Sequence, residues 1–236
     1  MNRHRRGFLA AAGGLAALAA LRARASDAGK RKIGVIGSGQ VGSALGAVWV
    51  KRGHEVMFSS RHIEHDRTLA AELGAGALAG TPREAAAFGE VVMISVPYGA
   101  LPDVAREVGD LVRGKAVIDT CNPFPWRDGK IAEWARARGA GLATAELLPG
   151  ARLVRAFNAI AASRMGTAHE TPGRVGMPIA GDDTDAVALV SGLVREIGYE
   201  PVLIGGLAKG RYLMPGTALA GEHRPAELRR IAATLD

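Results

Sequence analysis

Short apolar runs and amphipathic segments alternate along most of the chain. Continuous apolar runs are typical of parallel strands that are covered on both faces. We predict strands at residues 32–36, 54–58, 91–96, 115–119, 153–157, 175–180 and 201–204. Helices are predicted over residues 41–52, 101–112, 131–138 and 183–197, and Thr81-Pro82-Arg83-Glu84 is typical of a further helix start. Strands that alternate with helices favour an α/β fold with a doubly wound, mainly parallel sheet.

The first predicted strand runs directly into a glycine-rich turn, Gly37-Ser38-Gly39-Gln40-Val41-Gly42, which opens the first helix. Gly37 allows a tight turn, Gly39 lets the backbone approach a phosphate, and Gly42 lets helix and strand pack closely. The free N–H groups and the positive dipole end of the helix then face the anion. In this context the motif predicts a Rossmann-like domain that binds the pyrophosphate of a dinucleotide. A tight turn without a ligand is the alternative.

The loop after the second predicted strand bears on the choice of dinucleotide. An NAD-binding unit normally has an acidic residue about 20 residues after the glycines. Ser59, Ser60 and Arg61 hold that place here. Hydroxyls and a guanidinium donate hydrogen bonds to a 2′-phosphate, which a carboxylate would repel. NADP is therefore favoured over NAD, with His65 adding positive charge below neutral pH. The composition also fits an ordinary solvated loop.

The first 25 residues are predicted to be an export signal. An uncharged apolar run over residues 7–21 follows a basic start, and Ala23-Arg24-Ala25 is an A-x-A cleavage pattern. Arg5-Arg6 followed by Phe8-Leu9 is similar to the twin-arginine motif, whose export route carries folded proteins. We expect a periplasmic or secreted protein without a stable membrane span after cleavage. An uncleaved anchor is the alternative, although the run is short for a bilayer.

Removing this signal changes the charge of the protein. The whole chain has 30 basic and 23 acidic residues, a net charge of +7. The signal contains five arginines and no acid, so a net charge of about +2 remains and no nucleic-acid partner is expected.

We predict a signal over residues 1–25, an NADP-binding domain over 26–204, and a short C-terminal extension over 205–236 that contacts substrate or a partner subunit.

Ligands of doubly wound sheets bind in the crevice outside the carboxyl ends of the strands. Besides the glycine turn, the predicted strand ends lead into residues 59–61, 95–98, 120–123 and 157–160. Small polar groups at these ends are expected to meet the nicotinamide, its ribose and a second planar substrate. Each group alone fits an ordinary loop, but together they outline one site.

With these segments the chain resembles the NADPH-dependent reductases of the deazaflavin coenzyme F420, the F420-dependent NADP oxidoreductase family. The matching stretches are residues 33–42, 59–61, 92–98, 117–123, 156–158, 178–183 and 207–215. The cofactor contacts implied here are Gly37, Ser38, Gly39, Gln40, Val41, Gly42, Ser59, Ser60, Arg61, His65, Ser95, Val96, Pro97 and Asn122. The resemblance also places Asn158 and Ala161 near the substrate ring. Family members have a basic residue at the position that His65 occupies in this sequence. The export signal is also unusual, because the family is mainly cytoplasmic.

No catalytic residue is predicted, because hydride transfer between two bound rings needs orientation and electrostatics but no protein nucleophile. We expect Cys121 to be a packed residue. His62, His65 and Asp66 could suggest a metal site, but no further ligand lies nearby in the sequence at a typical spacing. No metal site is therefore predicted.

The sequence leaves three functions open. The first is an exported oxidoreductase that transfers a hydride between NADPH and F420 or a flavin-like acceptor, with a homodimer as the usual assembly. The second is an NADPH-dependent reductase of a ferric chelate, a quinone or a small carbonyl. The third is a non-enzymatic NADP-binding module. A 6-phosphogluconate-type dehydrogenase is disfavoured, because it needs a long helical C-terminal domain and a catalytic lysine, and Lys209 lies in a glycine-rich loop.

Overall fold

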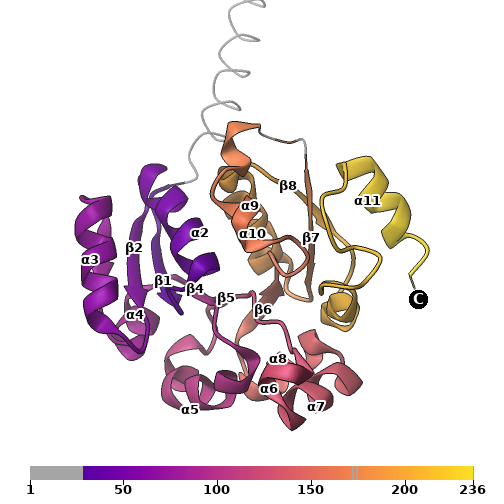
Figure 1. Ribbon diagram of the computed structural model, residues 1–236, viewed down its shortest axis with the longest axis horizontal. Helices are drawn as coiled ribbons and strands as arrows, with labels where there is room; N and C mark the ends of the chain where they lie inside the picture. Colours follow the sequence, from indigo (N-terminus) through magenta and orange to yellow (C-terminus); the bar gives the residue numbers. More distant parts are fainter. Residues whose placement is uncertain (1–28, 172, 174, 236) are drawn as a thin grey trace, which may run out of the picture. The chain divides into compact units, whose positions relative to one another are not determined.

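The computed structural model describes residues 29–171, 173 and 175–235 (Figure 1). The chain from Arg31 onwards forms one compact unit. The predicted export signal lies outside the described residues. Among those that are described, no helix combines the length and the apolar character needed to cross a membrane.

Eight strands form a single sheet in the order β3-β2-β1-β4-β5-β6-β7-β8. The strands are β1 (Lys32–Ile36), β2 (Glu55–Ser59), β3 (Ala77–Ala79), β4 (Val91–Ile94), β5 (Ala116–Asp119), β6 (Arg152–Arg155), β7 (Gly176–Gly181) and β8 (Glu200–Leu203). All neighbouring strands are parallel except β6 and β7. The predicted Rossmann-like, doubly wound and mainly parallel sheet is therefore confirmed.

The helices cover both faces of this sheet, which explains why its strands are apolar throughout. They are α2 (Gln40–Lys51), α3 (Ile63–Leu73), α4 (Pro82–Phe88), α5 (Leu101–Val112), α6 (Pro125–Asp128), α7 (Lys130–Arg138), α8 (Ala140–Leu147), α9 (Ala162–Met165), α10 (Thr184–Ile197) and α11 (Pro225–Ala232). Short 3-10 turns are η1 (Tyr98–Ala100), η2 (Ala168–Glu170) and η3 (Leu207–Tyr212). In Figure 1, α2, α9 and α10 lie above the central strands, and α5, α7 and α8 lie below them. Separate apolar clusters fill the two sides.

Two local predictions have clear outcomes. The predicted helix start at Thr81 is a capping box, in which Thr81 and Glu84 each bind the other's backbone N–H. The predicted strand over residues 153–157 is too long, because β6 ends at Arg155. Phe157 lies two residues further on with a φ of 66°, a left-handed conformation that a regular strand does not contain.

The C-terminal extension belongs to the same compact unit. Leu213, Leu219 and Leu228 are buried in a third apolar cluster with residues of β7 and β8. The backbone N–H of Gly176 in β7 donates to the carbonyl of His223 at 2.8 Å. The extension therefore covers the far end of the sheet, where α11 packs against β7 and β8.

Candidate functional site

The site begins where β1 turns into α2. Gly37 has a φ of 99°, and a Cβ on Gly42 would lie 2.1 Å from the carbonyl oxygen of Gly37. Glycine is needed at both positions, the first for its backbone conformation and the second for close packing. A Cβ on Gly39, by contrast, would meet nothing within 4 Å. Gly39 thus faces open space at the N-cap of α2, which is the place expected for a pyrophosphate.

The first turn of α2 can bind an anion. Gly39 supplies no side-chain cap, and the first turn contains no acidic residue. The first N–H groups of a helix have no intrahelical partner, and they carry the positive end of its dipole. Residues Gln40 and Val41 are therefore placed to donate backbone hydrogen bonds to a diphosphate.

The strand register aligns the polar ends that the sequence predicted. Across the sheet, Ser59, Ile36, Ile94, Asp119 and Arg155 are successive partners at the carboxyl ends of their strands. The segments that follow these residues lie at one edge. A cavity of about 250 Å³ opens there, lined by Gly39, Gln40, Val41, Ser95, Val96, Pro97, Thr120, Asn122, Phe124 and Arg127. Most of these residues are predicted cofactor contacts, so the structure brings the glycine turn and two further strand ends together.

Phe124 and Arg127 are lining residues that the sequence reasoning missed. The Arg127 guanidinium lies 5.0 Å from the centre of the Phe124 ring and donates to the carbonyl of Asn122 at 2.9 Å. It also binds Asp128 through two contacts of 2.8 Å. Burial opposes ionisation of Asp128, but hydrogen bonds from Arg127 and from backbone N–H groups outweigh it and lower the pKa of the carboxyl. The signal in the sequence is an aromatic residue directly after Asn122-Pro123, followed three residues later by an arginine.

A larger open hollow of about 420 Å³ lies between α5 and α8. Its lining includes Arg106, Asp110 and Arg113 but none of the predicted cofactor contacts. The cavity at the glycine turn is the better candidate for a nucleotide site, because it adjoins a helix N-terminus and two strand ends.

The last residue of β2 and the residues that follow it differ in exposure and contacts. Ser59 is fully buried, and its hydroxyl donates to the carbonyl of Val35 at 2.9 Å. Its side chain therefore faces the sheet, which corrects the expectation of a hydroxyl contact to the cofactor. The carbonyl of Ser59 accepts hydrogen bonds from the backbone N–H groups of Gly37 and Ser38. Arg61 and His65 are exposed, and Ser60 is half-buried.

Asp66 joins the glycine turn to the loop after β2. This residue of α3 is fully buried. Ser38 donates its hydroxyl proton to one carboxylate oxygen of Asp66, and Ser60 donates to the other at 2.8 Å. The sequence analysis considered Asp66 only as a metal candidate beside His62 and His65 and predicted no metal site there. Within the described residues, no group of three or more histidine, cysteine, aspartate or glutamate side chains is arranged to hold a metal ion.

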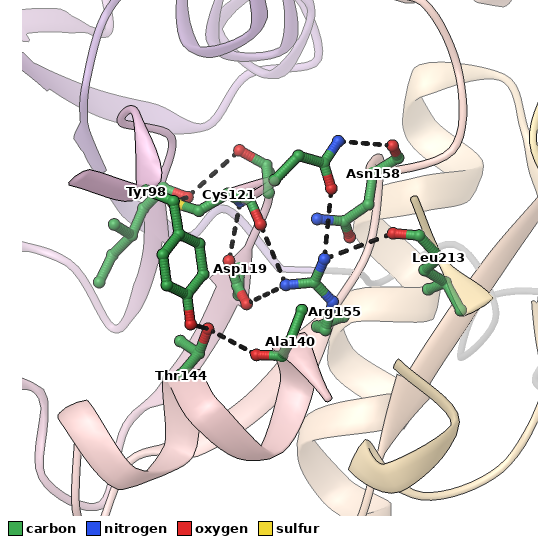
Figure 2. Close-up of polar contacts among 11 residues, drawn as sticks. Tyr98, Asp119, Cys121, Ala140, Thr144, Arg155, Asn158 and Leu213 are labelled. Atoms are coloured by element: carbon green, nitrogen blue, oxygen red, sulfur yellow. Dashed lines mark hydrogen bonds and ion pairs between the residues drawn. The ribbon is translucent and has the colours of Figure 1, made fainter. Parts of the chain in front are cut away.

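A buried ion pair organises the other end of the site (Figure 2). Arg155 and Asp119 are 0% and 1% exposed, and Nη1 of Arg155 lies 2.6 Å from the carboxylate of Asp119. The guanidinium also donates to three further acceptors, which are the carbonyl of Cys121 at 3.1 Å, Oδ1 of Asn122 at 3.3 Å and the carbonyl of Leu213 at 3.3 Å. The arginine thus connects β5, β6 and the C-terminal extension at the end of the site that contains Asn122.

The predicted substrate residues follow this ion pair. Nδ2 of Asn122 donates to the carbonyl of Asn158 at 2.8 Å, which fixes the loop after β6 against the cavity. The side-chain amide of Asn158 is itself buried, and neither its oxygen nor its nitrogen has a hydrogen-bond partner. Ala161 is exposed. An unpaired buried amide next to the left-handed Phe157 is unfavourable by itself, and such features are concentrated at functional sites.

Comparison with known families agrees with this geometry. Residues 32–123 match the family model described as NADP oxidoreductase, coenzyme F420-dependent. The matched segment runs from β1 through the glycine turn to the strand end at Asn122, so it contains every residue that lines the nucleotide cavity except Phe124 and Arg127. The resemblance to NADP-dependent oxidoreductases is confirmed, and NADP is the cofactor of the F420-dependent family.

Individual relatives extend the F420-dependent match beyond residue 123. The chain is 29% identical over 202 residues to the F420-dependent NADP reductase of Methanothermobacter thermautotrophicus, covering 80% of this chain and 87% of that protein. It is also 29% identical over 183 residues to the metalloreductase STEAP3 of Rattus norvegicus, covering 76% of this chain. The chain spans only 35% of the length of that metalloreductase.

Solved structures share the fold. A hypothetical protein of Sinorhizobium meliloti superposes with a TM-score of 0.70 at 26% identity, covering 83% of this chain and 95% of that chain. A putative F420-dependent NADP reductase of Arthrobacter superposes with a TM-score of 0.63 at 21% identity, covering 78% of this chain and 88% of that chain. The second likeness supports the fold alone.

Proposed function

We propose that the protein transfers a hydride between NADPH and a deazaflavin of the F420 type or a flavin-like acceptor. The observation that carries this proposal is the cavity of about 250 Å³, which joins the N-terminus of α2 to the polar ends of β4 and β5. The family match over residues 32–123 supports the cofactor and the reaction class.

The residues divide the work along the cavity. Backbone N–H groups at Gln40 and Val41 bind the diphosphate, and Arg61 provides positive charge for the 2′-phosphate. Val96 and Pro97 give the cavity an apolar wall, and Asn122 lines the end that we assign to the nicotinamide. Bound NADPH supplies the hydride, while the protein orients the two rings and excludes water between them. This division explains why the site functions without an acid–base pair.

A second candidate is reduction of a ferric chelate. The specific observation in its favour is the 29% identity to a protein named as a metalloreductase, over 76% of this chain. That reaction would use the same nucleotide cavity, so the two candidates differ only in the acceptor. Reduction of a quinone or a small carbonyl and nucleotide binding without catalysis are the remaining alternatives.

An acceptor panel separates these functions. Purified full-length protein is mixed anaerobically with NADPH and with F420, riboflavin, a ferric chelate or a quinone, and NADPH oxidation is followed by absorbance. We expect turnover with F420 or riboflavin that Arg61→Glu reduces at least tenfold, because a carboxylate repels the 2′-phosphate. Turnover with the ferric chelate alone would support the second candidate. NADPH binding without turnover of any acceptor would indicate a binding module.

We also propose that residues 1–25 direct export by the twin-arginine route and that the exported protein is a homodimer. The export proposal rests on Arg5-Arg6, the apolar run and the A-x-A pattern. The dimer rests only on the prevalence of two-fold symmetric dimers among soluble oligomers. In a bacterial host, Arg5→Lys combined with Arg6→Lys should retain the protein inside the cell, whereas the unaltered protein should reach the periplasm with a new N-terminus at Ser26. Mass spectrometry of each fraction tests the export, and light scattering tests the dimer. Intact Met1 in all fractions would contradict the proposed cleavage.

A further inference from the structure

An exposed aromatic side chain stands next to the nucleotide cavity. Trp126 of α6 is 81% exposed, and among the described residues it is the most exposed of the large apolar side chains. Its ring lies against that of Phe124, with the ring centres 5.7 Å apart and the planes tilted by 30°. Phe124 lines the cavity, whereas Trp126 is not among the lining residues. The aromatic pair, Phe124 and Trp126, therefore extends from the cavity wall to the open surface beside it.

The segment that carries the aromatic pair is held in place by one carboxylate. Asp128 accepts hydrogen bonds from the backbone N–H of Phe124 at 3.0 Å and from that of Gly99, in η1, at 3.1 Å. It also pairs with the guanidinium of Arg127, which lies 5.0 Å from the centre of the Phe124 ring. The Asp128 side chain is 1% exposed. A preorganised segment of this kind loses little freedom when a ligand covers it.

A ligand explains this exposure better than chance does. Contact between water and an aromatic ring is unfavourable, and stacking against a second ring removes it. Single exposed apolar residues are common on protein surfaces. Trp126 differs from them because its neighbour, Phe124, is part of a cavity wall. A flat molecule that covers Trp126 therefore also reaches the cavity.

The size of the cavity requires such an outer surface. Its volume of about 250 Å³ is below the range of about 300–1,000 Å³ that is typical of pockets for a single small ligand. It therefore does not enclose a nicotinamide and a second ring together. A hydride acceptor must nevertheless lie against the nicotinamide. Phe124 follows Asn122 by two residues, at the end of the cavity that we assign to the nicotinamide.

We infer that the aromatic pair is the binding surface of the hydride acceptor, and that it selects acceptors with a planar system of fused rings, which stack on Trp126. The inference rests on the proposed function, because the acceptor is the second substrate of that site. Flavins and deazaflavins have such rings. A small carbonyl, or an iron chelate of aliphatic carboxylates, has no ring to stack and gains nothing from Trp126.

The first test measures binding of the acceptor without turnover. Riboflavin and F420 are titrated separately into the full chain saturated with NADP⁺, and calorimetry gives the dissociation constants. Trp126→Ala should raise both constants about tenfold, a typical result of removing an aromatic side chain that stacks on a planar ring. Trp126→Phe keeps a ring and should stay within about threefold of the unaltered protein. Unchanged affinities in Trp126→Ala would overturn the inference.

Folding and nucleotide binding should be unaffected by these changes. Because Trp126 is exposed and lies outside the cavity lining, the affinity of each variant for NADP⁺ should stay within about twofold. Thermal unfolding should also give the same midpoint. A loss of NADP⁺ affinity equal to the loss for the two rings would assign Trp126 to the nucleotide site and overturn the inference.

Fluorescence shows whether the ring lies on the indole itself. A flavin stacked on an indole quenches its emission. Riboflavin should therefore quench the tryptophan emission of the unaltered protein, saturated with NADP⁺, more strongly than that of Trp126→Phe at equal occupancy. Equal quenching in the two proteins would place the flavin elsewhere and overturn the inference.

Trp134 supplies the matched control. It lies on α7, is 36% exposed and is not among the residues that line the cavity. Trp134→Ala should leave the affinities for riboflavin and F420 unchanged, and Trp134→Phe should retain the strong quenching. Light scattering tests a different occupant of the same surface, a second copy of the chain. Loss of self-association in Trp126→Ala with unchanged affinity for both rings would overturn the inference.

The outcomes separate this inference from the function on which it rests. Binding of riboflavin or F420 that depends on Trp126, but without oxidation of NADPH, supports the inference and overturns the proposed hydride transfer. Oxidation of NADPH by either acceptor with the same KM in Trp126→Ala overturns the inference and leaves the proposed function intact. Failure of both rings to bind the protein saturated with NADP⁺ overturns the two together.

Discussion

At the scale of single residues, Arg155 holds together the end of the site that contains Asn122 and Asn158. Its guanidinium binds the carboxylate of Asp119, two backbone carbonyls and the amide oxygen of Asn122. Removing one partner of a buried ion pair leaves an uncompensated charge in a medium of low dielectric constant. The energetic importance of Arg155 therefore depends on Asp119, although 36 residues separate them.

A double-mutant cycle measures this dependence. Asp119→Ala should lower the free energy of unfolding by about 3–5 kcal/mol, because the guanidinium stays buried without its counterion. Arg155→Met should cost a similar amount, and the double variant should lose clearly less than the sum of the two. Urea denaturation gives all three values. Additive losses would show that the two residues act independently and would contradict this account.

Stability at alkaline pH is also decided by individual side chains. Burial raises the pKa of the Cys121 thiol well above its ordinary value, and burial raises the pKa of Tyr199 to about 12. Both groups keep their protons in the folded state at a pH where the unfolded chain loses them. Their contribution to stability is therefore complete below about pH 8.5, the pKa of a free thiol, and it declines as the pH rises through the raised values.

The predicted result is a steeper loss of stability for the unaltered protein than for Cys121→Ala between about pH 9 and pH 10.5. Each group of this kind contributes a slope of about 1.4 kcal/mol per pH unit once the unfolded chain is deprotonated. Urea denaturation at several pH values provides the slopes. Parallel slopes for the two proteins would show that the thiol is ionised in the folded state.

At the scale of elements, the sequence predicts strands better than helices. Strands such as β1 and β4 are continuous apolar runs, and every predicted strand is present with small shifts at its ends. The short β3 was not predicted, since Ala77-Leu78-Ala79 is brief, and no bounds were predicted for α3, which has few large apolar residues. Sites that directly follow a strand, such as Asn122, could be predicted for this reason. Asp66 and Arg155 could not, because their roles arise from contacts between separate elements.

The turn between β1 and α2 gives the sharpest prediction at this scale. Gly39→Ala should change the free energy of unfolding by less than about 1 kcal/mol, since the added methyl meets nothing within 4 Å in the protein. It should weaken NADPH binding at least tenfold, because the methyl group lies where the diphosphate approaches the helix N-terminus. Thermal unfolding and calorimetry measure the two effects.

Gly109→Ala is the matched control, because a Cβ at this position of α5 also meets nothing within 4 Å. Its nucleotide affinity should equal that of the unaltered protein. Gly42→Ala should destabilise the fold itself, since its Cβ would lie 2.1 Å from the carbonyl of Gly37. Undiminished NADPH affinity in Gly39→Ala would remove the diphosphate from this turn.

At the scale of the whole molecule, the sheet reverses direction once. Strands β1 to β6, with β3 at one edge, direct their carboxyl ends to the nucleotide cavity, whereas β7 and β8 run the opposite way. The C-terminal extension covers these two strands, and the carbonyl of Leu213 reaches Arg155. The sequence suggested that residues 205–236 contact a substrate or a partner subunit. The described contacts give the extension a structural role in its own chain.

Leu228→Ala tests this structural role. Leu228 is fully buried between α11 and the end strands, so truncation should lower the free energy of unfolding by about 2–5 kcal/mol. NADPH affinity should stay within about twofold, because the residue lies outside the cavity. Normal stability with a change in acceptor turnover would instead assign the extension to the active site.

The central claim is that the N-terminus of α2 holds the diphosphate of NADP and directs the nicotinamide toward Asn122. The most direct measurement is a crystal structure of the protein grown with NADP⁺. We predict density for the diphosphate within about 3 Å of the backbone nitrogens of Gln40 or Val41, with the nicotinamide in the cavity beside Asn122. Nucleotide density in the hollow between α5 and α8, or none at millimolar NADP⁺, would contradict the claim.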